Sequence, residues 1–394
     1  MTATLTTTAR AGWFTEAEDR LREELTEHFA RQVEPHIPAW ESAGEIPLRD
    51  ILTALGERGM LGLRFPVERG GAGHSAWSHV VLAECLGELS SDSVGMSVTV
   101  HNDMVAPMIA EAGGPEAVER HLRPALTGRH LLAHAVSEPG AGSDVAAVAT
   151  TAVPVDGGYR VSGTKQWVIA GMYADAYAVL ARLPEAKPPF GYVLLMVPRS
   201  AEGVTVGPAD PTLGMRAAGV AGSVRLDEVF VPQSDRLGGH GLGLVTQLRQ
   251  FEPERIVSAC RALAIAARLL RDTRARLAER STFGESVGSR QEIVFRLARL
   301  EADIAAARQL AYTGIDRWVA GGDHRTVSAA VKLRSSRLTR RVARECLHLY
   351  GAQGQLTEEG VNRAFRDARL FSISTGSDEM MLTALARLNG WADD

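Results

Sequence analysis

Two segments that lie far apart in the chain contain residue types suited to proton transfer. "FEPERIVSA", residues 251–259, carries Glu254 beside Arg255 in a helix-like region. "SISTGSDEM", residues 372–380, has Thr375 directly before a glycine. A carboxylate can act as a general base near neutral pH, whereas a threonine hydroxyl cannot. The two segments raise the question of which residue, if any, takes a proton. On its own Glu254 is better explained as a solvated residue early in a helix, where its charge favours the helix dipole.

Three glycine-rich segments could bring backbone N–H groups close to a phosphate, because glycine lets the chain approach and curl around an anion. They are "SEPGAGSD" (137–144), "GGHGLG" (238–243) and "YGAQG" (350–354). Taken singly, each is better explained as a turn. The sequence contains neither G-x-G-x-x-G nor G-x-x-x-x-G-K-[ST], so a Rossmann dinucleotide site and a P-loop are not predicted.

Other familiar catalytic patterns are missing from the sequence. The histidines show no ligand spacing, no H-E-x-x-H occurs, and no metal site is predicted. No G-x-S-x-G nucleophile elbow is present, which argues against an acyl-enzyme mechanism. The three cysteines form no C-x-x-C pair, which fits a reducing cytoplasm better than a disulfide framework.

Composition and charge narrow the class of protein. With 394 residues the chain can bury a large core spread over two or three domains. The net charge of -4 does not favour a nucleic-acid or membrane-surface binder. No window of 18 apolar residues free of charge occurs, and the N-terminus has no signal-peptide core. We therefore expect a cytoplasmic protein.

The spacing of apolar residues changes twice along the chain. Thr15 and Glu18 form a capping-box signature ahead of apolar residues at helical spacing, which predicts a helix start. Short runs of β-formers such as "GYVLLMVP" and "SVRLDEVFV" follow, separated by turn signals. Long helical patterns with wide apolar faces then return, and they indicate a helix bundle.

This order predicts an α+β multidomain fold rather than a doubly wound sheet, because helices and strands occur in blocks. We expect an N-terminal α-helical domain, a middle antiparallel β domain and a C-terminal four-helix bundle, preceded by a disordered tail. The expected boundaries are 1–13 for the tail, then 14–130, 131–238 and 239–394 for the domains.

Several motifs in a fixed order resemble those of the acyl-CoA dehydrogenase family. They are "FPVERGGAG", "VHND", "AVSEPGAGSD", "SGTKQWV", "LGMRAAG", "ERSTFGESVGSRQ", "YGAQGQLTEEGVNRAFRDARL" and "STGSDEM". The resemblance covers nearly the whole chain, from about residue 20 to residue 391. It implies FAD held between the β domain and the bundle, in a homotetramer or homodimer whose neighbouring subunit contacts the adenine end.

The resemblance also implies roles for individual residues. The flavin and pyrophosphate would be bound by Val136, Ser137, Gly142, Ser143, Trp167 and Ile169. The adenosine side would be lined by His348, Tyr350, Gly351 and Ala352, with Ser377 and Glu379 closing it. The partner subunit's FAD would be gripped by Arg280, Phe283 and Gln291, where an arginine suits a pyrophosphate. The substrate would be bound by Ser143, Arg255, Ser374 and Gly376.

The sequence departs from the common family pattern at the base. Most members place the catalytic glutamate where this chain has Thr375, whose backbone N–H would remain available as an oxyanion donor. The isovaleryl and long-chain enzymes instead carry it in an "E-R-[IL]" segment, which matches Glu254, and Pro253 beside it would fit a first helical turn. Ile169 replaces a hydroxyl residue near flavin N5, and His348 replaces a glutamine that can also donate a hydrogen bond.

The function implied is FAD-dependent α,β-dehydrogenation of an acyl thioester on CoA or an acyl carrier protein, in lipid or secondary metabolism. Electrons would pass to an electron-transfer flavoprotein or to oxygen. Ile169 motivates one alternative, a flavin monooxygenase or oxidase of the same fold. Thr375 motivates another, a catalytically inactive FAD-binding assembly subunit. Arg366 and Asp367 in "RDA" are expected to form a structural ion pair.

Overall fold

The computed structural model describes residue 10 and residues 12–392, so most of the tail predicted to be disordered lies outside the described residues. The described end of that tail is ordered against the bundle. The Trp13 ring lies 5.4 Å from that of Trp77, and its Nε1 donates to Gln309 at 3.1 Å. Arg10 lies 3.3 Å from the buried carboxylate of Glu84. The predicted disorder is therefore wrong for these residues, because aromatic and charged contacts fix them.

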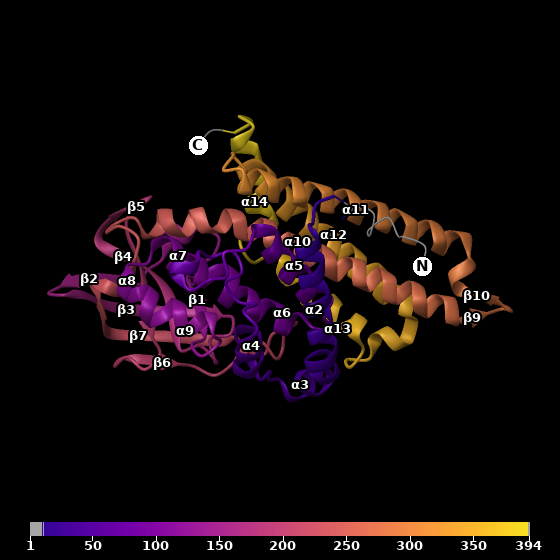
Figure 1. Cartoon of the computed structure of the whole chain (residues 1–394), viewed down its shortest axis with the longest axis horizontal. Coiled ribbons are helices and arrows are strands. Elements are labelled where there is room, and N and C mark those ends of the chain that lie inside the picture. Colours follow the sequence, from indigo (N-terminus) through magenta and orange to yellow (C-terminus); the bar gives the residue numbers. More distant parts are fainter. Residues whose placement is uncertain (1–9, 11, 393–394) are drawn as a thin grey trace.

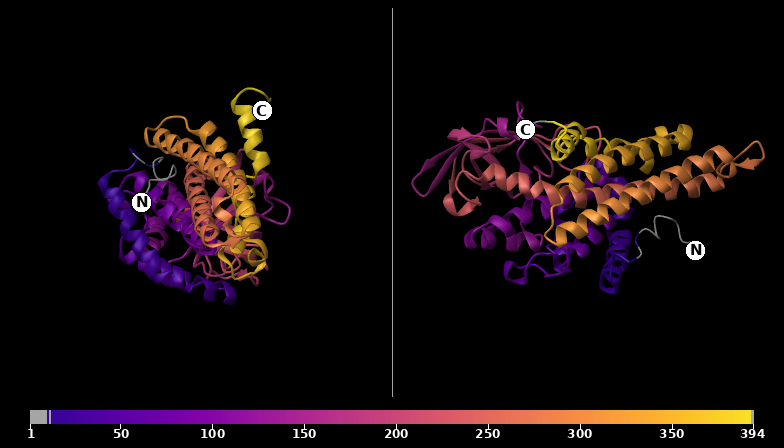
Figure 2. Two further views of the ribbon diagram at one scale, coloured as in Figure 1. Left: turned by 90° about the vertical axis from the view of Figure 1, so that its right-hand side faces the viewer. Right: turned by 90° about the horizontal axis from the view of Figure 1, so that it is seen from above.

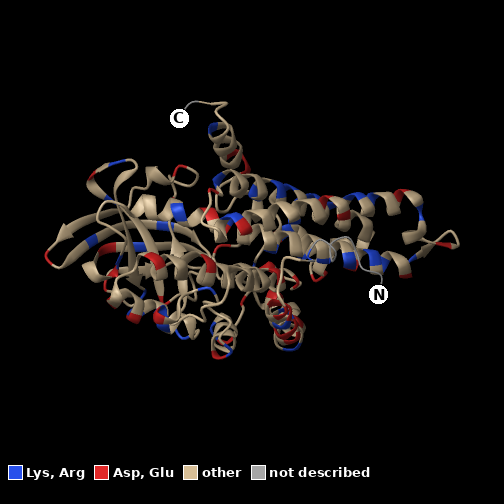
Figure 3. Cartoon of the chain, turned by 45° about the horizontal axis from the view of Figure 1, so that its top comes forward, with Lys and Arg blue, Asp and Glu red and all other residues tan. Residues whose placement is uncertain are grey.

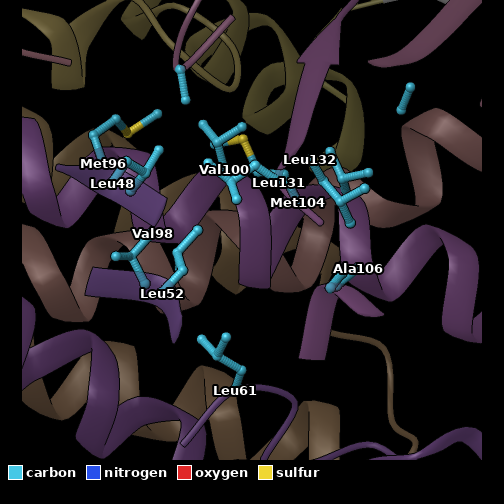
Figure 4. Close-up of a cluster of buried hydrophobic side chains, with 14 of the residues drawn as sticks. Leu48, Leu52, Leu61, Met96, Val98, Val100, Met104, Ala106, Leu131 and Leu132 are labelled. Atoms are coloured by element: carbon cyan, nitrogen blue, oxygen red, sulfur yellow. The ribbon is translucent and has the colours of Figure 1, made fainter. Parts of the chain in front are cut away.

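The N-terminal third is helical and packs around an apolar core. The helix predicted to start at Thr15 begins at the next residue, and the Thr15 N–H donates to the Glu18 carboxylate at 2.8 Å. The core brings together α4, α6 and the start of β1 (Figure 4). The helices are α2 (Glu16–Gln32), α3 (Ile37–Ala43), α4 (Leu48–Glu57), α5 (Ala76–Gly87), α6 (Asp92–Thr99), the π-helical η3 (Val100–Val105), α7 (Ala106–Ala112), α8 (Pro115–Ala117), the π-helical η4 (Val118–Leu122) and α9 (Arg123–Leu126).

A twisted sheet follows, in the strand order β6-β7-β3-β2-β4-β5-β8, with β1 pairing in parallel to β4. The remaining long pairs, β3 with β7 and β4 with β5, are antiparallel, as the turn-separated β runs predict. The inward face is lined by alternating apolar residues. The strands are β1 (Leu132–Ala135), β2 (Thr151–Val155), β3 (Gly158–Val168), β4 (Ala176–Lys187), β5 (Phe190–Pro198), β6 (Val204–Val206), β7 (Ala221–Pro232) and β8 (Arg236–Leu237).

The C-terminal part is a bundle built around one long helix, α10, which extends from the sheet to the β9–β10 hairpin (Figure 1). Helix α5 packs closely on it, since a Cβ added at Gly87 would lie 2.5 Å from the Arg261 carbonyl oxygen. The elements are α10 (Gly243–Glu279), β9 (Ser281–Thr282), β10 (Glu285–Ser286), α11 (Gln291–Val319), α12 (Arg325–Tyr350), α13 (Gly360–Asp367) and α14 (Asp378–Leu388).

One buried carboxylate ties the three parts of the chain together. Asp367, in α13, accepts the backbone N–H of Asp92 at 3.1 Å and that of Met215 at 2.6 Å. Arg366 instead donates to backbone carbonyls of its own region. The expected Arg366–Asp367 ion pair is therefore wrong for the described residues, because the two side chains leave the helix in different directions.

The molecule is elongated, with the sheet at one end and the hairpin at the other (Figure 2). Basic and acidic residues are interspersed along the ribbon at both ends (Figure 3). Within the described part of the chain, no helix combines the length and apolarity needed to span a membrane.

Candidate active site

The two segments singled out from the sequence meet in the fold. Arg255 donates a hydrogen bond from Nε to the carbonyl oxygen of Thr375 at 2.8 Å, and its guanidinium also lies 5.6 Å from the Phe251 ring centroid. Thr375 has a φ of 53°, a conformation that a β-branched residue adopts only under constraint. Glu254, the candidate base, is therefore the sequence neighbour of Arg255, whose side chain holds the Thr375 residue that offers the candidate oxyanion N–H.

Glu254 is 2% exposed, and neither of its carboxylate oxygens has a hydrogen-bond partner among the described residues. Burial raises its pKa to about 8, and Asp103 adds to the rise, while Arg255 and two other cations oppose it. The alternative of a solvated residue is therefore wrong. An ionised carboxylate without donors is costly, so this group takes up a proton near neutral pH.

Glu254 lies in the interior of α10 rather than at its start, so the expected first-turn position is also wrong. Pro253 stands inside the helix, where it cannot donate the usual backbone hydrogen bond. The buried face that carries Glu254 is turned toward η3, because Gln250 donates to the Asp103 carbonyl oxygen at 3.2 Å. Pro253 suggests a helix start in the sequence because proline is favoured in a first turn, whereas α10 begins ten residues earlier, at Gly243.

The loop that carries Val136, Ser137, Gly142 and Ser143 is anchored by a buried ion pair. Glu138 accepts from Lys165 Nζ at 2.6 Å, and Lys165 also donates to the Val136 carbonyl oxygen at 3.1 Å. Ser137 accepts a backbone hydrogen bond from β3 at 2.8 Å. The tip of the loop stays open, since Gly142 and Ser143 are exposed.

Trp167 lies near the end of β3, and Ile169 directly follows that strand. Trp167 is 53% exposed and has a φ of 55°, so it is not a core residue of the sheet. Ile169 is half-buried and packs against the N-terminal core. An exposed aromatic face beside an open glycine loop can receive a planar ring system.

A second group of predicted residues gathers at the far end of the bundle. Arg280 Nη1 lies 3.5 Å from where a Cβ at Gly351 would stand, so the hairpin arginine and the "YGAQG" turn are neighbours. Phe283 at the hairpin tip is 98% exposed, and Tyr350 packs 4.7 Å from the Arg276 guanidinium. The other predicted residues of this region, all exposed, are Gln291, His348 and Ala352.

The segment around Thr375 is compact and ends in a helix start. Ser374 and Gly376 are half-buried, and Gly376 has a φ of 102°, a conformation that explains the glycine. Ser377 caps α14 by accepting the Met380 N–H at 3.3 Å, and Glu379 is exposed in the first turn. Ser377 therefore has a structural partner in its own helix.

Family models match three successive parts of the chain. The N-terminal, middle and C-terminal domain models of acyl-CoA dehydrogenase match residues 15–129, 133–229 and 239–388, respectively. The chain belongs to the acyl-CoA dehydrogenase family. Its fold is the family fold, and it is an oxidoreductase of that type.

Individual relatives agree with this assignment. An acyl-CoA dehydrogenase structure from Geobacillus kaustophilus is 32% identical with a TM-score of 0.92, over 96% of this chain and 99% of that one. A short-chain specific acyl-CoA dehydrogenase of Clostridium acetobutylicum is 27% identical over 93% of this chain and 96% of its own length. A glutaryl-CoA dehydrogenase from Mycobacterium smegmatis, solved with FADH2, shares the fold at 23% identity and a TM-score of 0.92, with all of both chains covered.

The residues present fit the FAD that this family binds. An exposed Trp167 and a loop with open glycines stand at one end of the bundle's long helix. Arg280 and Phe283 stand at its other end, where both are exposed and the Phe283 ring centroid lies 5.7 Å from the Arg290 guanidinium. Among the described residues, no group of His, Cys, Asp and Glu is arranged to hold a metal ion.

The acyl-CoA dehydrogenase fold also brings in residues that the sequence analysis did not single out. Lys165 and Glu138 both lie within the motifs quoted above. Burial of Lys165 could have been predicted, because it falls at the alternating spacing of Tyr159 and Val161, the inward positions of β3. Lys332 falls on a buried stripe of small polar residues of α12, at the helical spacing of Ser328, Lys332, Ser335 and Thr339. A lysine within such a stripe indicates a buried amine with a specific partner.

Proposed function

We propose that this acyl-CoA dehydrogenase family member catalyses FAD-dependent α,β-dehydrogenation of an acyl thioester, on CoA or an acyl carrier protein, with Glu254 as the base. The observation that carries the proposal is the buried Glu254 carboxylate, which has no hydrogen-bond partner among the described residues. Burying such a group lowers the stability of the folded protein, and a role as the catalytic base explains why the group is kept there.

Glu254, Thr375 and Arg255 have different roles in the proposed reaction. Glu254 takes the α proton as the α C–H bond breaks, and the electron pair of that bond moves onto the thioester carbonyl. The Thr375 backbone N–H stabilises the resulting enolate oxygen, in the manner of an oxyanion hole. FAD, when bound, supplies the acceptor for the hydride that leaves the β carbon, and the electron pair of the enolate forms the α,β double bond as that C–H bond breaks. Arg255 holds the Thr375 carbonyl, so it orients the peptide groups of the donor segment.

A raised pKa suits this task. A base with a pKa near the working pH is partly ionised and still strong enough to take a carbon-bound proton. With a pKa of about 8, about a tenth of Glu254 is ionised at pH 7. The rate of flavin reduction is therefore expected to rise about tenfold between pH 6 and pH 7.

FAD binding is proposed from the exposed residues at the two ends of α10. The flavin half of one FAD would be held by Val136, Ser137, Gly142, Ser143, Trp167 and Ile169. The turn from His348 to Ala352 lies beside Arg280 at the other end of α10, a helix about 55 Å long, so it would line the adenosine half of a second copy's FAD. Arg280, Phe283 and Gln291 would reach the FAD of a second copy, in a homodimer or homotetramer. The FADH2 complex of the glutaryl-CoA dehydrogenase neighbour supports the cofactor.

The test is anaerobic reduction of the FAD-loaded protein by butyryl-CoA, isovaleryl-CoA, palmitoyl-CoA and the matching acyl-carrier thioesters. We expect at least one thioester to bleach the flavin band. Glu254→Gln should slow that reduction by about 100- to 10,000-fold, the usual contribution of a general base. Glu252→Gln, on the same helix and partly exposed, is the matched control and should reduce at the wild-type rate.

Two outcomes would contradict the proposal. Bleaching that survives Glu254→Gln unchanged would show that another group takes the proton. Absence of bleaching by every thioester would favour the inactive assembly subunit. Fast reoxidation of the reduced protein by air would instead support the oxidase or monooxygenase that Ile169 motivates.

A further inference from the structure

A buried lysine lies directly behind the segment that carries Thr375. Lys332, in α12, is 5% exposed, and its Nζ donates to the Phe371 carbonyl oxygen at 2.7 Å. It lines a small pocket together with Arg255, Ser258, Ser335, Ser374 and Thr375. A buried ammonium group is costly unless it is paired, so its place here needs a specific reason.

Lys332 and Arg255 hold the two ends of one short segment. Lys332 binds the carbonyl of Phe371, and Arg255 binds the carbonyl of Thr375 at 2.8 Å. Between these two anchors the chain turns sharply, and it reaches Thr375 with a φ of 53°. The direction of the Thr375 N–H is therefore set by two cations on two different helices, α12 and α10.

The charges around Lys332 come from every element packed against it. Asp378 attracts its ammonium, Arg255 repels it, and Glu379 and Glu254 attract it more weakly. Asp378 is itself bound by the Ser336 hydroxyl at 2.5 Å and paired with Arg337 at 3.4 Å. Burial lowers the pKa of Lys332 to about 8, so it is mostly protonated at pH 7.

The same ammonium acts on Glu254 across α10. The pKa of Glu254 is raised first by burial and also by Asp103, and it is lowered by Arg255, Arg261 and Lys332. Lys332 thus favours the ionised carboxylate, which is the form that can take a proton.

We propose that Lys332 is a positioning residue for the dehydrogenation, which together with Arg255 aims the Thr375 N–H at the thioester oxygen. The inference rests on the proposed function, and it adds a second contribution to that function. No bond of Lys332 is made or broken during the reaction. Its ammonium holds the Phe371 carbonyl and stays charged while the enolate forms.

The test compares three variants with wild type, all loaded with FAD. Lys332→Met removes the charge and keeps the length and volume of the side chain. Lys332→Arg keeps the charge. Arg334→Met removes a cation from the same helix, where Arg334 pairs at the surface with Asp303 at 2.9 Å, and is the matched control. Flavin reduction is followed anaerobically from pH 6 to pH 10, with the thioester from the butyryl-, isovaleryl- and palmitoyl-CoA set that reduces wild type.

We expect Lys332→Met to slow reduction by about 10- to 100-fold at saturating thioester, because a misdirected donor costs about this much. It should also raise the pKa seen in the pH–rate profile by roughly half a unit to one unit, since a nearby cation is lost. Lys332→Arg should keep the wild-type pKa even if its rate falls. Arg334→Met should match wild type in both measurements.

Two results would overturn the inference. One is a Lys332→Met protein whose rate and pH profile match those of Arg334→Met. The other is a slower rate with an unmoved pH profile, which would reduce Lys332 to packing. If Lys332→Met does not retain FAD, Lys332→Gln tests the same loss of charge with a donor kept. Failure of wild type to bleach would refute the proposed function, not the role of Lys332 alone.

Discussion

Replacing Glu254 with glutamine should make the protein more stable at alkaline pH, and this effect needs no substrate. The folded state binds the Glu254 proton more tightly than the unfolded chain, because burial raises the pKa from 4.5 to about 8. Glu254 therefore contributes its full stabilisation of the folded state only below pH 4.5, the pKa of the unfolded chain. That stability is lost progressively as pH rises to about 8. Glutamine does not titrate, so the variant escapes the loss.

The size of the effect follows from the two pKa values. A pKa that rises from 4.5 to about 8 is equivalent to a preference of about 4 to 5 kcal/mol for the protonated folded state. Part of the loss has already occurred at pH 5, so the gain of the variant over wild type should grow by about 3 to 4 kcal/mol between pH 5 and pH 8.5. For a chain of this length that is about 4 to 5 °C in melting temperature if it unfolds as one unit.

The assay is thermal or denaturant unfolding of wild type and Glu254→Gln at pH 5, 6, 7, 8 and 8.5. Only the change of their difference with pH is used, because the amide has its own constant effect on the buried site. Glu23→Gln, at an exposed position of α2, removes the same charge and should show a difference that varies little with pH. A difference between Glu254→Gln and wild type that is flat from pH 5 to pH 8.5 would refute the reasoning, since it would show an ordinary pKa for Glu254.

Three further predictions concern the neighbouring structure. Thr375→Ala keeps the backbone N–H, so flavin reduction by an active thioester should stay within about threefold of wild type, and a loss of 100-fold would show that the hydroxyl is used. Asp367→Ala leaves two buried backbone N–H groups without an acceptor and should cost about 2 to 4 kcal/mol in denaturant unfolding, against a smaller cost for Asp367→Asn. Lys165→Met leaves Glu138 buried and unpaired, so it should cost about 3 to 5 kcal/mol and lower the FAD-to-protein ratio of the purified protein; full FAD occupancy would contradict the anchoring role of the pair.

Local patterns in the sequence were sufficient for the architecture. The capping signature at Thr15 predicted a helix start that the structure has. The β runs pair in an antiparallel sheet, apart from β1 and a single bridge of β2. These features depend on residues close in sequence, which is why a periodic pattern can predict them.

Local patterns failed where a helix start, a tail or a side-chain partner depended on distant residues. Pro253 lies inside α10, where the Ser328 hydroxyl of α12 donates to the Glu252 carbonyl oxygen at 2.8 Å, so a tertiary contact supports the helix beside the missing hydrogen bond. Trp13 is ordered because Trp77 and Tyr312 surround it, and neither is near it in sequence. Asp367 pairs with backbone groups of two other parts of the chain instead of its neighbour Arg366.

The sequence by itself determined which chemical groups this protein has: a carboxylate at Glu254, only a backbone donor at Thr375, and a lysine at position 332. Only the tertiary structure decided that these groups belong together. Burial removed the hydrogen-bond partners of Glu254 and raised its pKa, and Arg255 linked α10 to the Thr375 segment. The physical reason is that a pKa and a donor's direction depend on the dielectric and the charges within a few ångströms, and those neighbours come from helices that meet only when the chain folds.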